Sequence, residues 1–139
     1  MGEDVGGGAA AGPSLERLRA LRGKLLHLHK VLLDSERAEY EAAHGRVTAG
    51  ELLQLALNDR QFAWLRGLSE LVVLIDEALD PKEPAAVPGA DALLAQARKL
   101  LKPSEEGSEF ARRYFAALQR EPEAVLAHRE ATRLLSDAG

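Results

Sequence analysis

Leucine and alanine dominate the apolar residues of this 139-residue chain, which contains 25 Leu and 24 Ala against 7 Val, 1 Ile and 2 Thr. Aromatic residues make up only 4% of it. Leu and Ala favour helices, whereas strands are built mainly from β-branched and aromatic residues. The chain is therefore expected to be all-α, and the composition disfavours a β-rich or doubly wound α/β fold.

Length and charge narrow the class of protein further. A chain of this length is expected to form one domain. The absence of Cys excludes disulfides, thiol nucleophiles and thiolate metal sites. The net charge of -4, with both signs interspersed, provides no general attraction to nucleic acid or to an anionic membrane. No apolar run is long enough for a membrane span and no secretory signal is recognised, so we expect a cytoplasmic protein.

Two long helical segments joined by a short turn form the expected frame. Residues 1–12 are rich in Gly and Ala and are predicted to be a disordered leader. Leucines at helical spacing predict a helix over 14–44, which Gly45 ends. A capping-box sequence at Thr48 starts a second segment over 48–79. The connection is so short that the two segments must pair as an antiparallel hairpin.

The remainder of the chain is punctuated by turn residues. Asn58 and Asp59 interrupt or restart the second segment, because both prefer helix caps to helix interiors. Three prolines predict a linker over 80–89. We expect further helices over 90–101, 108–120 and 122–136. Together these elements predict a single helical-bundle domain of about five helices over 13–138.

The two arms of the hairpin carry opposite charge. Residues 14–33 have a net charge of +4, whereas residues 70–91 have a net charge of -5. We therefore expect these segments to lie side by side in the fold.

A wide apolar surface follows the interruption at Asn58 and Asp59. Trp64 is there either an anchor of the core or an interface hot spot, since Trp is enriched in both environments. We expect the surface of residues 59–79 to contact a protein partner, with a second copy of the chain as the first candidate. The expected anchors of that contact are Phe62, Trp64, Leu68 and Leu71.

The apolar stripe of the first helix becomes polar in its second half without changing direction. His29, Glu36, Glu39 and Tyr40 continue the line of buried leucines. A buried ion costs several kcal/mol unless it is paired or bound to a metal. These side chains therefore predict a buried polar site with partners from elsewhere in the chain.

A salt bridge, a metal ion and a small ligand are the open interpretations of that site. Arg113, or its neighbour Arg112, is the expected cation. Glu41 and His44 have the Glu-x-x-His spacing of carboxylate-bridged di-metal bundles, but such bundles use two of these motifs and this chain has one. Further ligands for such an ion would come from His29, Glu36, Glu70 and His128. No metal and no other cofactor is assigned.

His128 completes the candidate buried polar site. It borders alanines of the last predicted helix, where a histidine is typically a core-edge residue. If it met Glu36 or Glu39, the pKa of its imidazole would rise and the contact would depend on pH.

No catalytic motif accompanies these residues. The chain lacks the sequence patterns of nucleotide-binding loops, serine hydrolases, zinc proteases and EF-hands. Basic and aromatic residues alternate at 112–115, but the many acidic residues around them argue against nucleic acid. We expect a non-catalytic protein that acts by protein contact, first of all by self-association. The alternative is a helical bundle that binds a metal or a small ligand, with oxidoreductase-like chemistry.

Overall fold

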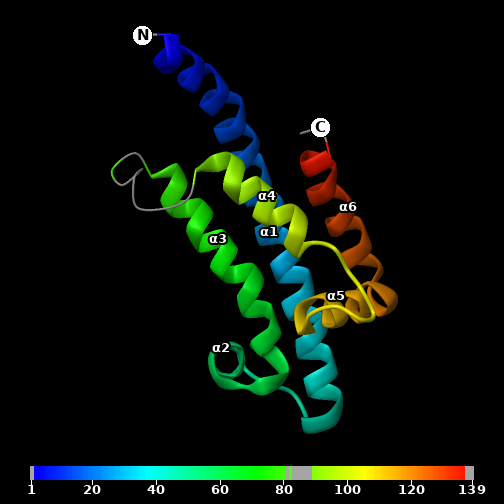
Figure 1. Ribbon diagram of the computed structural model, residues 1–139. Coiled ribbons are helices and arrows are strands. Elements are labelled where there is room, and N and C mark those ends of the chain that lie inside the picture. The colour runs from blue at the N-terminus through cyan, green and yellow to red at the C-terminus, as the bar shows by residue number, and fades with distance from the viewer. Residues whose placement is uncertain (1, 81, 83–88, 137–139) are drawn as a thin grey trace.

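Helices account for almost all regular structure of the chain. The computed structural model describes the backbone of residues 2–80, 82 and 89–136, and side chains within these ranges from residue 12 onward. No strand occurs among these residues, which confirms the predicted all-α helical bundle (Figure 1). The elements are α1 (Gly2–His44), α2 (Ala49–Asn58), the 3-10 helix η1 (Arg60–Leu65), α3 (Arg66–Leu79), α4 (Ala90–Leu100), α5 (Glu109–Arg120) and α6 (Pro122–Ser136).

The long helix α1 is the spine of the bundle. In Figure 1, α3 and α4 run along one side of it, α6 runs along the other, and α5 crosses between them. The stripe of leucines predicted for 14–44 faces these neighbours, and Leu18, Leu21, Leu25, Leu28 and Leu32 are fully buried. On α6 the buried positions are mostly alanines, Ala124, Ala127 and Ala131. These small side chains let the backbones of α6 and α1 approach closely.

The two ends of α1 correspond to two sequence predictions, a disordered leader over 1–12 and a helix end at Gly45. Its backbone begins at Gly2, within the segment 1–12 for which a disordered leader is predicted. The side chains of residues 1–11 lie outside the described part, and that prediction stays a prediction. At the other end, Gly45 has φ of 90° and its N–H donates to the Glu41 carbonyl at 2.8 Å. Gly45 therefore ends the helix in the left-handed conformation that its position predicts.

α3 lies antiparallel to α1, as predicted for the hairpin. An ion pair joins Arg22 to Asp76, while further along α1 the ring of Tyr40 lies 6.0 Å from that of Phe62. Residue numbers thus rise along one helix as they fall along the other. The Arg22–Asp76 pair also shows that the basic and acidic segments lie side by side, in agreement with their opposite charges.

The second arm of the hairpin is broken into three elements at the predicted interruption. α2 ends before Asp59, whose side chain accepts from the Gln61 N–H at 2.8 Å and starts η1. The capping box at Thr48 is present, with Glu51 as its second member. α2 then turns away from α1, and none of its side chains is buried.

The remaining connections agree with the proline positions. α3 ends at Leu79 and α4 begins at Ala90 after Gly89. Within the predicted linker 80–89, residues 81 and 83–88 lie outside the described part. One hydrophobic cluster extends from Leu18 to Leu135. No helix of the described part is both long enough and apolar enough to cross a membrane.

The two helix caps Thr48 and Ser108 should differ in effect. Ser108 accepts from the Ala111 N–H at 3.1 Å and starts α5, which carries buried Tyr114. Ser108→Ala should therefore lower the free energy of unfolding of the whole domain by about 1 kcal/mol. Thr48→Ala should instead reduce amide protection only within α2, since that helix holds no buried side chain. Hydrogen exchange with urea denaturation measures both, and an equal global loss in both variants would contradict this view of α2.

Candidate functional site

Glu36 is the centre of a buried hydrogen-bond network. The residue is 3% exposed, and three donors surround the carboxylate. Gln61 Nε2 donates to Oε1 at 3.0 Å, while Trp64 Nε1 at 3.2 Å and an Arg120 guanidinium nitrogen at 2.9 Å donate to Oε2. Arg120 Nε also donates to the hydroxyl of Ser35 at 3.0 Å. We call this set the Glu36 network.

The Glu36 network joins distant parts of the chain. Glu36 belongs to α1, Gln61 and Trp64 to η1, and Arg120 to the last turn of α5. No buried side-chain N or O atom in the described part lacks a hydrogen-bond partner. Glu36 is thus held in a salt bridge, the first of the three interpretations, and protein donors engage both of its carboxylate oxygens.

The cation of this salt bridge is not the expected arginine. Arg113 lies 3.8 Å from Glu109 in an i,i+4 ion pair, and Arg112 Nε donates to the Gly107 carbonyl. Arg120 is two helical turns after Arg113, so both lie on the same side of α5. Arg120, on the later of these turns, is the arginine that reaches Glu36, at 2.9 Å.

The other members of the candidate buried polar site lie apart from Glu36. Glu39 is exposed, and Tyr40 stacks on His44 with ring centroids 4.2 Å apart. Glu41 accepts from the Val47 N–H at 2.9 Å, a bond that lowers the pKa of its carboxyl and stabilises the turn after α1. Among the described residues, no group of three or more His, Asp or Glu side chains could hold a metal ion.

His128 is paired with Tyr114 instead of with a carboxylate. The Tyr114 hydroxyl and His128 Nδ1 are 2.6 Å apart, and Tyr114 is fully buried. Burial raises the pKa of the Tyr114 hydroxyl and lowers the pKa of the His128 imidazole. The condition for a raised histidine pKa, a contact with Glu36 or Glu39, is therefore not met.

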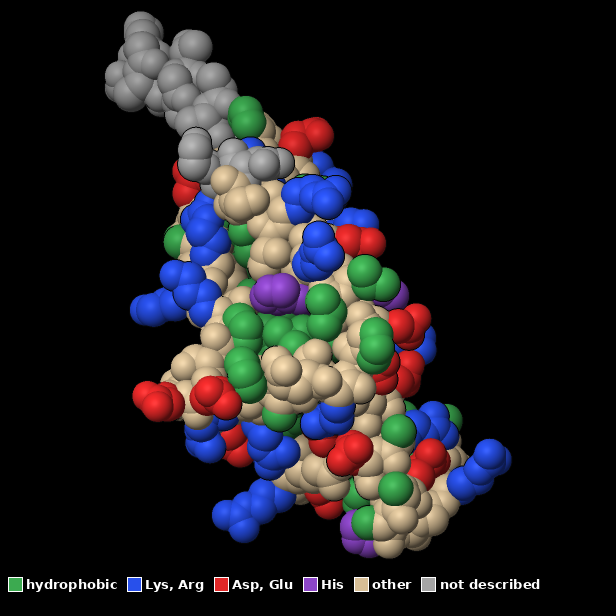
Figure 2. All heavy atoms as spheres, turned by 90° about the vertical axis from the view of Figure 1, so that its right-hand side faces the viewer, with side chains coloured by type: hydrophobic (Ala, Val, Ile, Leu, Met, Phe, Trp, Pro, Cys, Tyr) green, Lys and Arg blue, Asp and Glu red, His purple; other side chains and the backbone are tan. Residues whose placement is uncertain are grey.

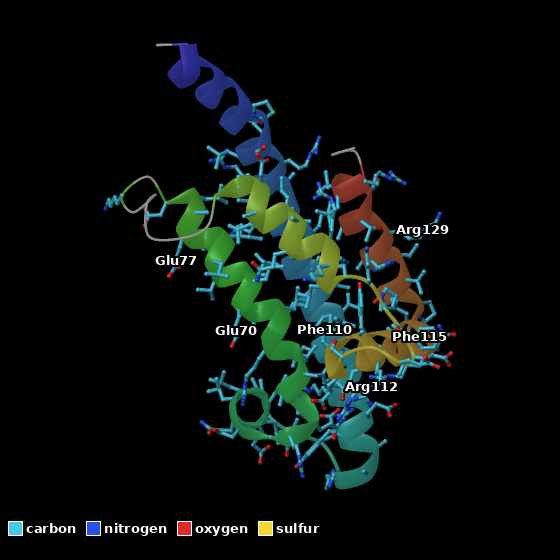
Figure 3. All side chains as sticks on the ribbon, viewed as in Figure 1. Glu70, Glu77, Phe110, Arg112, Phe115 and Arg129 are labelled. Atoms are coloured by element: carbon cyan, nitrogen blue, oxygen red, sulfur yellow. The ribbon has the colours of Figure 1, made fainter. Side chains whose placement is uncertain are left out.

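The four predicted interface anchors lie inside the chain's own core. Phe62 is 1% exposed, Trp64 5%, Leu68 0% and Leu71 1%. Trp64 packs on Phe110 at 5.3 Å and donates to Glu36, which makes it a core anchor. A contact surface on the 59–79 segment cannot use these side chains, and Figure 3 shows that Glu70 and Glu77 of α3 extend outward.

His29 lines a surface groove between α1, α2 and α3. The groove has a volume of about 320 Å³, and its walls include His29, Leu33, Leu57, Leu65, Ser69 and Glu70. Partial burial lowers the pKa of the His29 imidazole, because burial disfavours its charged form.

Exposed apolar side chains gather around this groove. Five large hydrophobic side chains of the described part are exposed, and four belong to α1, α2 and α3: Leu26 (41%), Leu53 (58%), Leu57 (56%) and Val73 (54%). Leu57 lines the groove, and the other three lie one helical turn from residues that line it. We call the groove together with these four side chains the groove face.

The side of the bundle formed by α5 and α6 also carries apolar side chains. Figure 2 shows the side that carries α5 and α6, where hydrophobic side chains in the middle are flanked by Lys and Arg above and by both signs below. In the described part of α5 and α6, Leu126 is the only large hydrophobic side chain classed as exposed, at 59%.

Sequence reasoning missed Arg120, Gln61 and the groove face. Arg120 has nearly the same helical-wheel position as Arg113, so helical periodicity alone does not distinguish the two arginines. The direction of the Gln61 side chain depends on the 3-10 helix that begins after the Asp59 cap. The signal for the groove face was the leucine content of α2, which exceeds what one buried stripe requires.

Comparison of the chain with known protein families, with curated proteins and with solved structures finds no match.

Removal of the Arg120 cation should destabilise the fold. Arg120→Gln leaves the buried Glu36 carboxylate without its charged partner, and it should lower the free energy of unfolding by about 2 kcal/mol in urea denaturation. Arg129→Gln, on the exposed surface of α6 (Figure 3), is the control and should change it by less than about 0.5 kcal/mol. Equal effects in the two variants would show that the Glu36 network does not hold α5 in place.

Acid should destabilise the protein through its two partly buried histidines. The ordinary histidine pKa is 6.5, and burial lowers it for His29 and His128 in the folded state. Between the lowered value and 6.5 the unfolded chain binds more protons, so stability falls as pH drops through this window. His128→Asn cannot titrate there and retains an acceptor for Tyr114, so it should lose less stability than the wild type in denaturation measured across pH.

Tyr114→Phe is the control for the cause of this effect. It removes the hydrogen bond but leaves His128 half-buried, so the loss of stability in acid should persist. A wild type and a His128→Asn variant with the same pH dependence would refute the role of His128.

Proposed function

We propose that this chain is a non-catalytic cytoplasmic protein that acts by self-association through its groove face. The observation that carries the proposal is α2, a ten-residue helix with four leucines and no buried side chain. Two of these leucines, Leu53 and Leu57, are more than half exposed. An apolar helix surface next to a groove is the usual form of a helix-binding site.

The location of the contact differs from the sequence expectation. Phe62, Trp64, Leu68 and Leu71 hold the core together, while the exposed apolar side chains lie beside them on α1, α2 and the outer edge of α3. The proposed contact thus moves from the 59–79 surface to a neighbouring surface, to which that segment contributes Val73 and part of the groove wall.

A metal- or ligand-binding bundle, the alternative expectation, has less support. It needs the candidate polar side chains in one place, whereas Glu36, His128 and His29 lie in three separate environments. Each of the first two already has a protein partner.

Removing the α2 leucines should weaken self-association. A leucine that becomes fully buried contributes about 1.5 kcal/mol, or about ten-fold in Kd. Leu53→Ser with Leu57→Ser should therefore raise the dimer Kd by at least about ten-fold in sedimentation equilibrium. Leu126→Ser is the matched control, because it is the same residue type with similar exposure on α6.

Two results would overturn the proposal. One is a wild-type chain that stays monomeric over the whole range of concentration. The other is a Leu126→Ser variant that associates as weakly as the α2 double variant, which would move the contact to α6.

A further inference from the structure

The two helices that border the groove face carry opposite charges on their outer edges. Arg19 and Lys30 are exposed on α1, and Glu70 and Glu77 are exposed on α3. On a helical wheel, Arg19 and Lys30 lie within about 40° of Leu26, and they stand on either side of it along the helix axis. Val73 likewise lies between Glu70 and Glu77 along α3. Each edge thus has one exposed apolar side chain with two like charges beside it. Opposite charges lie at the far end of each edge, where Lys30 pairs with Asp34 at 2.9 Å within the chain and the exposed Arg66 precedes Glu70 by one turn.

The register between α1 and α3 puts these edges at matching heights. Three contacts fix the antiparallel register: Arg22 with Asp76, Glu36 with Trp64, and Tyr40 with Phe62. Counting along both helices from these contacts, Leu26 is level with Val73. By the same count, Lys30 is within about one turn of Glu70, and Arg19 within about one turn of Glu77.

We propose that two copies of the chain pair through the groove face about a twofold axis parallel to α1 and α3. This arrangement, which rests on the proposed function, lays α1 of each copy on α3 of the other at equal height. Lys30 then faces Glu70 of the second copy, Arg19 faces Glu77, and Leu26 packs on Val73. A twofold axis across the helices would place α1 on α1 and α3 on α3, with like charges opposed.

The geometry of the four helices agrees with this choice of axis. α1 is antiparallel to α3 within a chain, and a twofold axis along the helices leaves their directions unchanged. Each helix of the pair is therefore antiparallel to both neighbours, as in an up-and-down four-helix bundle, and helix dipoles of adjacent helices oppose each other.

Apolar burial and charge have different roles in this interface. The leucines and Val73 supply affinity, since apolar area removed from water dominates association. Exposed ion pairs contribute little each, but twofold symmetry makes every pair occur twice. The charges therefore select the axis by disfavouring the alternative arrangement.

Charge reversal tests the proposed arrangement. Lys30→Glu and Glu70→Lys should each weaken self-association by about ten-fold, because each places two repulsive pairs in the dimer. The Lys30→Glu, Glu70→Lys double variant should return to within about three-fold of the wild type. Arg129→Glu and Glu123→Lys make the same changes of net charge on α6 and should leave association unchanged.

A mixture of the two single variants provides the sharpest readout. In a dimer of one Lys30→Glu chain and one Glu70→Lys chain, the introduced glutamate faces the introduced lysine. The unchanged Lys30 of one chain faces the unchanged Glu70 of the other, so both cross-chain pairs unite opposite charges. Native mass spectrometry should therefore show more mixed dimer than the statistical share.

Failure of this arrangement is distinguishable from failure of the proposed function. Association of the wild type without rescue in the double variant, and with a statistical mixture of the singles, overturns the arrangement alone. Absence of any wild-type association overturns both. Circular dichroism and thermal denaturation of each variant test whether the exposed substitution leaves the fold intact.

Discussion

The rest of the structure depends on the need of one buried carboxylate for hydrogen bonds. Glu36 lies in the apolar stripe of α1, where water cannot solvate it. Its donors come from η1 and from the end of α5, so both elements must dock at this height of α1. The Glu36 network thus fixes η1 and the end of α5 against α1.

The exposed face follows from the break in the second arm of the hairpin. A continuous helix over 48–79 would lay its apolar stripe on α1 along its whole length. Once Asp59 ends α2 and η1 turns towards Glu36, Leu53 and Leu57 of α2 remain more than half exposed. The groove of about 320 Å³ between α1, α2 and α3 lies beside these side chains. An exposed apolar surface of this kind is a reason for a helical domain to associate.

Predictions from the sequence were correct where they rest on neighbouring residues. They were wrong where they depend on contacts between residues far apart in the chain. The capping box at Thr48, the left-handed Gly45 and the interruption at Asp59 each follow from a few neighbouring residues. The burial of Glu36 also followed, because helical periodicity puts it in line with the leucines. Its partner did not, since Arg113 and Arg120 occupy the same side of α5 and only the docking of α5 distinguishes them. The contact of His128 likewise depended on a neighbouring helix, because Tyr114 belongs to α5 and periodicity within α6 carries no information about it.

The sequence by itself determined that the protein is helical, where most of its helices begin and end, and that one acidic side chain of the first helix must find partners. These properties depend on propensity, capping and the 3.6-residue period, which act within a single element. Only the tertiary structure decided which arginine neutralises Glu36, that Trp64 serves the core, and that leucines of α2 face solvent. Such outcomes depend on which elements come together, because burial and pairing are properties of contacts between residues far apart in the chain.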